Sequence, residues 1–351
     1  MPGITIVGSG HYVPGEPVTN AALSRVMDTD DAWIKKRTGI AQRHFAPEGV
    51  GASDLAVEAA RRAISDAGLT PGDIDYILFS TMTPDYLFPG SGGLLGSKLG
   101  IPGVPALDLR QQCCAMPFAF QVADGLVSAG AAENVLVVGA EAHAGFMPWR
   151  DWDVVEGHAD RRPEPADYDR ATRHRSLAIL FGDGASALVM RRAPAGRGLI
   201  GVEVHTDGAA ARQIYIEGGG FRRRPYWSPQ MFDDELHIPS MDGRELFKNA
   251  VTKLPAVVRS LCKTHDVALD QIDWFIAHQA NDRINLAVVD ALGVPPSKVP
   301  SNIARFGNTS SATIGILMDE LRREGRVKPG ELLCFLALGS GLHWGAALMR
   351  L

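Results

Sequence analysis

The chain has 351 residues, of which 46% are hydrophobic and 21% are charged, a balance that excludes wholesale disorder and allows a large core. Its formal net charge of −5 argues against nucleic acid as the main partner. There is no apolar run that could cross a membrane, and no secretory signal pattern at the N-terminus. The four cysteines form neither a disulfide framework nor a zinc motif. We therefore expect a cytoplasmic protein without a membrane segment or a metal site.

Taken in chain order, the predicted elements alternate between helices and apolar strands. Ser53 is a candidate N-cap for a helix over residues 54–67, which Gly68 would end. A buried strand, YILFST, follows. The continuous apolar runs VLVVGAE and ALVMRR are typical of strands in a sheet that is covered on both faces. This alternation predicts an α/β layered fold.

Parts of the sequence recur at an offset of 198 residues. IDYILF at 74–79 matches IDWFI at 272–276, and ENVLVVGAE matches ELLCFLALG at the same offset. The same offset relates Cys113 to Ser311, and each of these residues opens an apolar helical stretch. We therefore predict two duplicated halves, residues 1–195 and 196–351, related by a pseudo-two-fold axis.

Two polar stretches, residues 146–175 and 212–235, interrupt this pattern. Both are rich in charged and aromatic residues, and the second contains three consecutive glycines and three consecutive arginines. We expect most of these residues to form solvated surface loops, with a substrate lid or a docking edge as the alternative.

Four local patterns carry candidate chemistry. In DLRQQCCAMPF, Cys113 begins an apolar helix, where the helix dipole would lower the pKa of its thiol, although a cysteine there can also be a small buried hydrophobe. In FIAHQAND, His278 follows a buried strand, as active-site residues of α/β folds do, or simply occupies a turn. Gly307 permits a tight turn before Asn308, which offers an amide or caps a helix.

The fourth pattern is the glycine-rich turn around Ser340 near the end of the chain. Its backbone N–H groups could approach a reacting group closely, or it could be an ordinary turn between strands. Together, a cysteine nucleophile, a histidine, an asparagine amide and backbone donors are the groups that carbon–carbon bond formation between thioesters requires.

Over nearly its whole length, the sequence resembles the β-ketoacyl-acyl-carrier-protein synthase III family of thiolase-fold condensing enzymes. The resemblance is carried by DDAWIKKRTGI, FPG, the Cys113 segment, VVGAE, FGDGASALVM, HQAN, GNTSSA and the terminal G-S-G-x-x-W-G. It implies a thiolase-like, duplicated α-β-α-β-α layered fold. The first half would carry the nucleophile, and the second half would carry the histidine and the asparagine.

The resemblance also implies roles for single residues. Cys113, rather than its neighbour Cys114, matches the acylated nucleophile, and His278 and Asn308 match the pair that drives decarboxylation. The backbone N–H groups of Cys113 and Ser340 match the oxyanion hole.

The remaining positions match substrate contacts. Trp33, Arg37 and Arg175 match positions that bind coenzyme A, and Arg283 matches a contact to the carrier protein. Phe88 matches a residue that reaches across a homodimer interface to cap the partner's acyl pocket. Met116 stands beside the nucleophile where the family usually has another residue, which implies a reshaped acyl pocket. That departure and the long 146–175 stretch imply an acyl group longer or more unusual than acetyl.

The implied reaction is ping-pong. An acyl-CoA or acyl carrier protein acylates Cys113, and malonyl-acyl carrier protein then condenses with the acyl group in fatty-acid or polyketide biosynthesis. Coenzyme A thioesters are substrates, and no metal or redox cofactor is implied. The main alternative is an offshoot from specialised metabolism that joins two acyl units, or that transfers the acyl group to an alcohol or amine without decarboxylation.

The sequence is less consistent with three different functions. A degradative thiolase would carry a second cysteine in a terminal C-x-G loop, which here holds Gly339–Gly341. A dinucleotide-binding motif at Gly8 and Gly10 lacks its third glycine, because position 13 is Val13. A non-catalytic subunit would not need to keep the cysteine, the histidine and the asparagine together.

Overall fold

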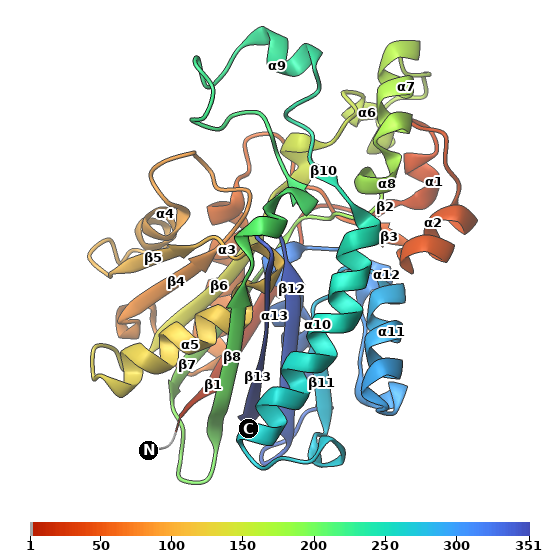
Figure 1. Ribbon diagram of the computed structural model, residues 1–351. Coiled ribbons are helices and arrows are strands. Elements are labelled where there is room, and N and C mark those ends of the chain that lie inside the picture. Colours follow the sequence, from red (N-terminus) through yellow and green to blue (C-terminus); the bar gives the residue numbers. More distant parts are fainter. Residues whose placement is uncertain (1–2) are drawn as a thin grey trace.

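The computed structural model describes residues 3–351, so Met1 and Pro2 of the predicted first half lie outside the described range. Two mixed β-sheets organise the chain (Figure 1). The first sheet has the strand order β1-β7-β6-β4-β5. Its strands are β1 (Ile4–Tyr12), β4 (Tyr76–Ser80), β5 (Ala106–Leu109), β6 (Val135–Glu141) and β7 (Gly184–Arg192).

The second sheet has the order β11-β12-β13-β8. Its strands are β8 (Gly198–Thr206), β11 (Trp274–Ala277), β12 (Leu332–Gly339) and β13 (His343–Arg350). Its pairing repeats that of the first sheet. The outer strand pairs antiparallel with the last strand, the last strand pairs antiparallel with the next, and that strand pairs parallel with the following one.

The offset seen in the sequence also governs the structure. Strand β11 begins 198 residues after β4, and helix α13 (Thr313–Arg323) begins 198 residues after α5 (Ala115–Ser128). The short 3₁₀ turns before these two helices, η2 (Gln112–Cys114) and η7 (Ser310–Ala312), keep the same spacing. The division at about residue 195 stays a prediction, and the location of the two sheets on either side of it supports the prediction.

Helices form three layers around the sheets. Helices α5 and α13 lie between the sheets, because α5 packs on both β6 and β12, and α13 packs on both β1 and β11. Helices α3 (Ala52–Asp66) and α4 (Ser91–Lys98) cover the outer face of the first sheet, and α10 (Gly243–Thr264) and α11 (Asp282–Leu292) cover that of the second (Figure 1). The α-β-α-β-α layering is confirmed.

Alternating burial explains these layers. Along α3 the alanines at positions 52, 56, 59, 60 and 63 are fully buried, and this small-residue face lets the helix lie close to the sheet. Strand β6 is buried at every residue, as expected for a strand covered on both faces. Gly51 begins α3 as its N-cap, so the expected cap at Ser53 lies inside the helix instead.

Short helices form a separate cluster beside the second sheet. They are α1 (Asn20–Leu23), α2 (Asp31–Thr38), α6 (Trp152–Val155), α7 (Pro165–Arg173), α8 (Arg175–Ala178) and α12 (Ile303–Phe306). Within 146–175, Val154 and Ala171 are fully buried and Trp149 is 3% exposed. The expectation of solvated loops therefore fails for these residues, because their apolar side chains complete the core of this helical cluster.

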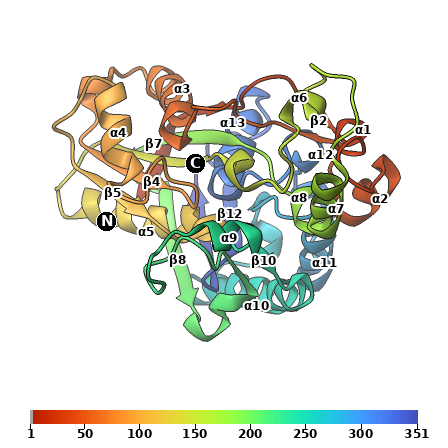
Figure 2. The ribbon, with the colours of Figure 1, turned by 90° about the horizontal axis from the view of Figure 1, so that it is seen from above.

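The second polar stretch lies over the carboxyl end of the second sheet. It contains β9 (Ile214–Tyr215) and α9 (Pro229–Asp233), and β9 pairs with β10 (Ser240–Met241). Seen from above, α9 and β10 lie over the end of β12 (Figure 2). The remaining short strands, β2 (Val18–Thr19) and β3 (Gln42–Arg43), pair near α1.

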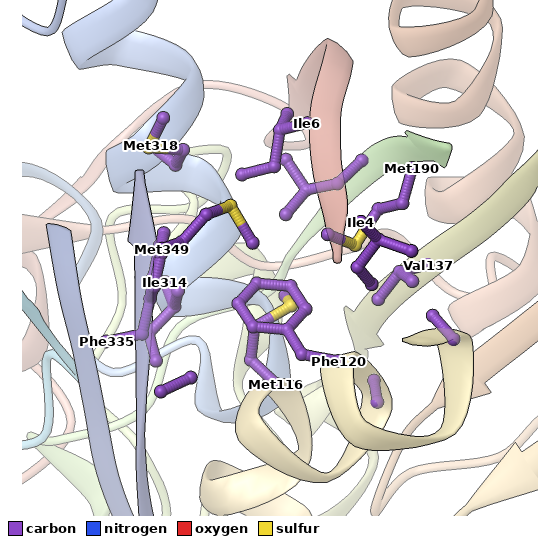
Figure 3. Close-up of a cluster of buried hydrophobic side chains, with 14 of the residues drawn as sticks. Ile4, Ile6, Met116, Phe120, Val137, Met190, Ile314, Met318, Phe335 and Met349 are labelled. Atoms are coloured by element: carbon purple, nitrogen blue, oxygen red, sulfur yellow. The ribbon is translucent and has the colours of Figure 1, made fainter. Parts of the chain in front are cut away.

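The central core lies between the sheets, around α5 and α13. Figure 3 shows Met116 and Phe120 of α5 facing Ile314 of α13 and Phe335 of β12. The rings of Phe120 and Phe335 meet edge to face with centroids 5.1 Å apart. This packing joins the two halves and fixes the positions of the turns that precede α5 and α13.

Candidate active site

Cys113 stands on a sharp turn between strand β5 and helix α5. The preceding residue, Gln112, has a φ of 52°, a left-handed conformation that non-glycine residues rarely adopt. At the equivalent position of the second half, Ser310 has a φ of 47°. The two turns meet, because Cys113 Sγ lies 3.4 Å from Ser310 Oγ.

Burial changes the chemistry expected of Cys113. Loss of solvent raises the pKa of its thiol to about 12; the hydrogen bond with Ser310 lowers it, and the charge of Glu141 raises it further. The expectation of a lowered pKa from the helix dipole is therefore not met, because desolvation outweighs it. Cys113 is a neutral thiol at rest and must lose its proton during the reaction.

Cys114 points away from the site. Its side chain is fully buried, and its Sγ contacts the carbonyl oxygen of Ala337 at 3.3 Å. Burial raises the pKa of this thiol well above its usual value. Of the two adjacent cysteines, only Cys113 lines the cavity described below.

The loop that holds Asn308 requires glycine at position 307. Gly307 has a φ of 65°, and a Cβ there would lie 3.0 Å from the carbonyl oxygen of Leu180. The Asn308 side-chain oxygen accepts a hydrogen bond from the Ser310 N–H at 2.8 Å. Because the oxygen accepts this bond, the amide NH₂ group is the end left for the cavity.

The buried carboxylate of Glu141 supports the loop that carries Asn308. Glu141 ends β6, is fully buried, and accepts hydrogen bonds from the hydroxyl of Ser311 at 2.7 Å and from the hydroxyl of Thr83 at 2.8 Å. It therefore ties the turn before α13 to the first sheet. This role was not predicted from the sequence, although Glu141 is part of the VVGAE motif.

His278 follows strand β11, and its side chain is 5% exposed. Its Nδ1 lies 2.7 Å from the hydroxyl of Thr313, and its Nε2 has no hydrogen-bond partner among the described residues. Burial lowers the pKa of His278 to about 3, so its ring is neutral at neutral pH. A neutral ring can donate one hydrogen bond without bringing a charge into the site.

The three predicted catalytic side chains and Ser340 line one cavity of about 890 Å³. Cys113 comes from the first half and His278 and Asn308 from the second, so the fold brings together segments that are distant in the chain. At the end of β12, a Cβ on Gly339 would lie 2.9 Å from the backbone nitrogen of Cys113. Glycine therefore lets the turn that carries Ser340 lie directly against the nucleophile. The use of the Cys113 and Ser340 N–H groups as an oxyanion hole stays a prediction.

The three residues predicted to bind coenzyme A also come together. The guanidinium carbons of Arg37 and Arg175 lie 4.0 Å and 4.9 Å from the ring centroid of Trp33. Arg175 also pairs with Asp28 at 2.7 Å. This cluster is not part of the cavity lining, whereas Arg283 is exposed and lines a small neighbouring hollow of about 310 Å³.

The two residues predicted for the acyl pocket lie outside the cavity. Met116 is 2% exposed and packs in the central core, and no atom of it lines the cavity (Figure 3). Phe88 is 75% exposed, while its neighbour Leu87 lines the cavity instead. Neither residue therefore lines the Cys113 cavity within one chain.

Other lining residues come from the 212–235 stretch, which contributes Ile214, Gly219 and Trp227. Most of this stretch is exposed, as expected for a surface loop, and these residues also cover the cavity, which fits the alternative of a substrate lid. The aromatic and glycine content of the 212–235 stretch indicated that it could cover a site, but the sequence did not indicate which surface of the protein this stretch would cover. In residues 3–351, no group of three His, Cys, Asp or Glu side chains is arranged to hold a metal ion.

Comparison with known proteins agrees with this geometry. Residues 107–208 match the family model of 3-oxoacyl-[acyl-carrier-protein (ACP)] synthase III, and residues 262–351 match the model of its C-terminal part. The chain belongs to the 3-oxoacyl-[acyl-carrier-protein] synthase III family. It is 39% identical over 352 residues to the β-ketoacyl-[acyl-carrier-protein] synthase III of Rhodospirillum rubrum, a match that covers 99% of this chain and 98% of that protein.

Solved structures of synthase III proteins have the same fold. The enzyme from Aquifex aeolicus superposes with a TM-score of 0.84 at 34% identity, covering 99% of this chain and 100% of that one. The priming β-ketosynthase from the R1128 polyketide biosynthetic pathway superposes with a TM-score of 0.82 at 29% identity, covering 99% and 96%. The predicted thiolase-like fold is confirmed.

Membership in the synthase III family also confirms the predicted enzyme class. The chain is an acyl-transferring condensing enzyme, and its reaction is a decarboxylative condensation in fatty-acid or polyketide biosynthesis. Among residues 3–351, no helix combines the length and the apolar character that crossing a bilayer requires.

Proposed function

We propose that this synthase III transfers an acyl group from a coenzyme A or carrier-protein thioester to Cys113, and then condenses that group with malonyl-acyl carrier protein. The observation that carries the proposal is the cavity in which Cys113, His278 and Asn308 meet. A thiol, a neutral imidazole and an amide in one cavity are the groups that the two half-reactions need.

In the first half-reaction, Cys113 Sγ attacks the thioester carbonyl. The Sγ–carbonyl bond forms, the bond to the departing thiol breaks, and the thiol proton of Cys113 ends on the leaving sulfur. The backbone N–H groups of Cys113 and Ser340 would hold the transient oxyanion, and the close contact of Gly339 with Cys113 supports this assignment.

In the second half-reaction, the malonyl thioester carbonyl accepts hydrogen bonds from His278 and Asn308. These donors stabilise the enolate that forms when the carboxylate leaves as carbon dioxide. The enolate carbon attacks the acyl-Cys113 carbonyl, and the Cys113 thiolate leaves and is reprotonated. A neutral imidazole favours decarboxylation, because a charged imidazolium would instead stabilise the carboxylate that must leave as carbon dioxide.

Substrate delivery involves residues outside the cavity. Trp33, flanked by Arg37 and Arg175, offers an aromatic face and two cations to a nucleotide with phosphates. Arg283 is exposed near the cavity and would contact the carrier protein. Substrates and carrier are thus bound by side chains of this chain, and coenzyme A thioesters enter as substrates rather than as a resident cofactor.

We extend the proposal to a homodimer. Phe88, Tyr86 and Leu107 are large apolar side chains that are 75%, 61% and 40% exposed, and such a group favours a protein contact. In a homodimer, Phe88 would cap the acyl pocket of the partner subunit. Its exposure within one chain is the observation that supports this assignment.

The test begins with the purified protein and a panel of acyl-CoAs, with the intact mass as the readout. We expect one acyl adduct per chain that is absent from Cys113→Ala, followed by loss of the adduct and release of carbon dioxide when malonyl-acyl carrier protein is added. Loading without carbon dioxide release, but with transfer to an alcohol or amine, would instead identify the specialised-metabolism alternative. No adduct from either coenzyme A or carrier-protein donors would overturn the proposal.

A further inference from the structure

The cavity that contains Cys113 continues into the second half of the molecule. Beyond the catalytic residues it runs between the outer face of the second sheet and helices α10 and α11, where Leu254, Leu292 and Leu336 line it. We call this part the α10–α11 crevice. None of the steps proposed above uses it.

The floor of the crevice begins beside the nucleophile. Leu336 and Leu338 of β12 point toward α10 and α11, because alternate residues of a strand face the same side. The next residue, Gly339, touches the backbone of Cys113. From Gly339 back to Leu336, the strand spans about 10 Å. Gly339 faces the opposite side of the sheet from Leu338, so a chain attached to Cys113 would reach the crevice by passing around the carboxyl end of β12, within the one cavity that both regions line.

The walls of the crevice are two helix faces with the same spacing. Residues four apart lie on one side of a helix, and both rows are apolar and span about 12 Å. They are Leu246, Ala250 and Leu254 on α10, and Ile284, Val288 and Leu292 on α11. Ala250, in the middle of its row, is the smallest of these side chains and leaves the space open. The two rows are thus suited to an alkyl chain, and one amide, Asn285, whose side-chain nitrogen has no hydrogen-bond partner among the described residues, lines the cavity beside them.

In the first half of the molecule, the equivalent helix packs against its sheet without lining this cavity. Helix α3 occupies the place of α10, and its Leu55, Ala56 and Ala59 are fully buried and line no part of this cavity. In the second half, by contrast, Ala250 and Leu254 of α10 line the cavity. Unfilled apolar space between packed elements reduces stability, so the cavity on this side has a reason to be kept.

We propose that the α10–α11 crevice holds the alkyl chain of a medium- or long-chain acyl group carried on Cys113. This inference rests on the proposed function and adds the class of acyl substrate. The crevice is continuous with the nucleophile, is lined by apolar side chains along both helices, and is long enough for an extended chain. A short acyl group would leave it empty.

Two variants narrow the crevice from opposite walls. Ala250→Leu adds bulk from α10, and Val288→Phe adds bulk from α11. The matched control is Ala256→Leu, because Ala256 is on the exposed face of α10. The rate of Cys113 acylation is measured by intact mass with acetyl-, butyryl-, octanoyl-, lauroyl- and myristoyl-CoA, after thermal melting shows that each variant is folded.

We expect the native chain to load octanoyl and longer groups. Each narrowing variant should load lauroyl and myristoyl groups about tenfold or more slowly while keeping acetyl loading within about twofold, since one or a few carbons in an apolar pocket have effects of this size. Ala256→Leu should match the native chain.

Four results would overturn the inference. The native chain could load only acetyl and butyryl groups, in which case the proposed function stands and the crevice is not an acyl site. The narrowing variants could leave the chain-length profile unchanged, or slow every chain length equally, and either outcome would show a structural role for the crevice. A chain that loads no acyl group on Cys113 would overturn the proposed function together with this inference.

Discussion

The Thr313 hydroxyl lies 2.7 Å from Nδ1 of His278, although the two residues are 35 positions apart in the chain. The same hydroxyl donates a hydrogen bond to the Ser310 carbonyl oxygen at 3.0 Å. Its contact with Nδ1 fixes the orientation of the imidazole ring, whose Nε2 has no other hydrogen-bond partner among the described residues. The proposed contact between His278 and the malonyl carbonyl depends on this orientation.

This contact makes Thr313 a positioning residue. We predict that Thr313→Val, which has nearly the same shape but no hydroxyl, slows carbon dioxide release from malonyl-acyl carrier protein by about tenfold to a hundredfold, because the ring loses the hydroxyl that orients it. Acyl loading on Cys113 should change less than threefold. Thr313→Ser, which keeps the hydroxyl, should restore the decarboxylation rate. Equal loss of both half-reactions would instead show that Thr313 only supports the fold.

Replacing the Asn308 amide tests the second donor. In Asn308→Asp the oxygen that accepts from Ser310 N–H is kept, but an anion replaces the NH₂ group that faces the cavity. We expect decarboxylation to fall by about a hundredfold or more, as for the loss of one oxyanion donor, while Cys113 still accepts an acyl group. Single-turnover loading and carbon dioxide release, measured separately, check this. Unchanged carbon dioxide release would remove Asn308 from the mechanism.

Protonation of His278 should make the fold sensitive to acid. The pKa of His278 is about 3 in the folded state and about 6.5 when it is unfolded, so below pH 6.5 the unfolded chain binds a proton that the folded chain does not. Stability is therefore lost as the pH falls from 6.5 toward 3.

Between pH 7 and pH 5, this linkage lowers the free energy of unfolding by about 2 kcal/mol. Urea unfolding of the native chain and of His278→Gln at both pH values isolates the effect, because other acid-sensitive groups are shared. An equal loss in both proteins would contradict a neutral His278.

The stacked Trp33 tests the coenzyme A site. Trp33→Ala removes the ring between Arg37 and Arg175, and we expect KM for acyl-CoA to rise about tenfold, the size of one or two cation–π contacts. The rate with an acyl donor that lacks the nucleotide should stay within about twofold. Lys35→Ala, an exposed change on the same helix, is the control. A similar loss with both donors would show that Trp33 acts on the fold rather than on the nucleotide.

Local patterns carried much of the correct prediction. The offset of 198 residues is visible in short apolar runs, and the structure repeats it at β4 and β11 and at the starts of α5 and α13. Cys113, His278 and Asn308 each stand at the end of an apolar strand or at the start of a helix, but their roles were indicated only by their combination and by the resemblance to the synthase III family. Such patterns lie within short segments, so they can be recognised without knowledge of the tertiary structure.

Other properties depend on packing between distant segments. The sequence pattern could not show that Met116 turns into the central core, that the 212–235 stretch covers the cavity, or that Thr313 contacts His278. It also predicted a lowered pKa for Cys113, whereas the pKa is about 12. A helix dipole can be inferred from one segment, but desolvation is set by everything that surrounds the thiol.

Periodicity by itself indicated the order of the elements, and the sequence motifs, through their resemblance to the synthase III family, indicated the family and the candidate reacting groups. Only the tertiary structure decided which groups share one cavity, how far burial shifts their pKa values, and which helices of the duplicated fold line that cavity. Those properties arise where α5, α13 and the two sheets pack together, and close packing depends on the shapes of side chains from both halves at once.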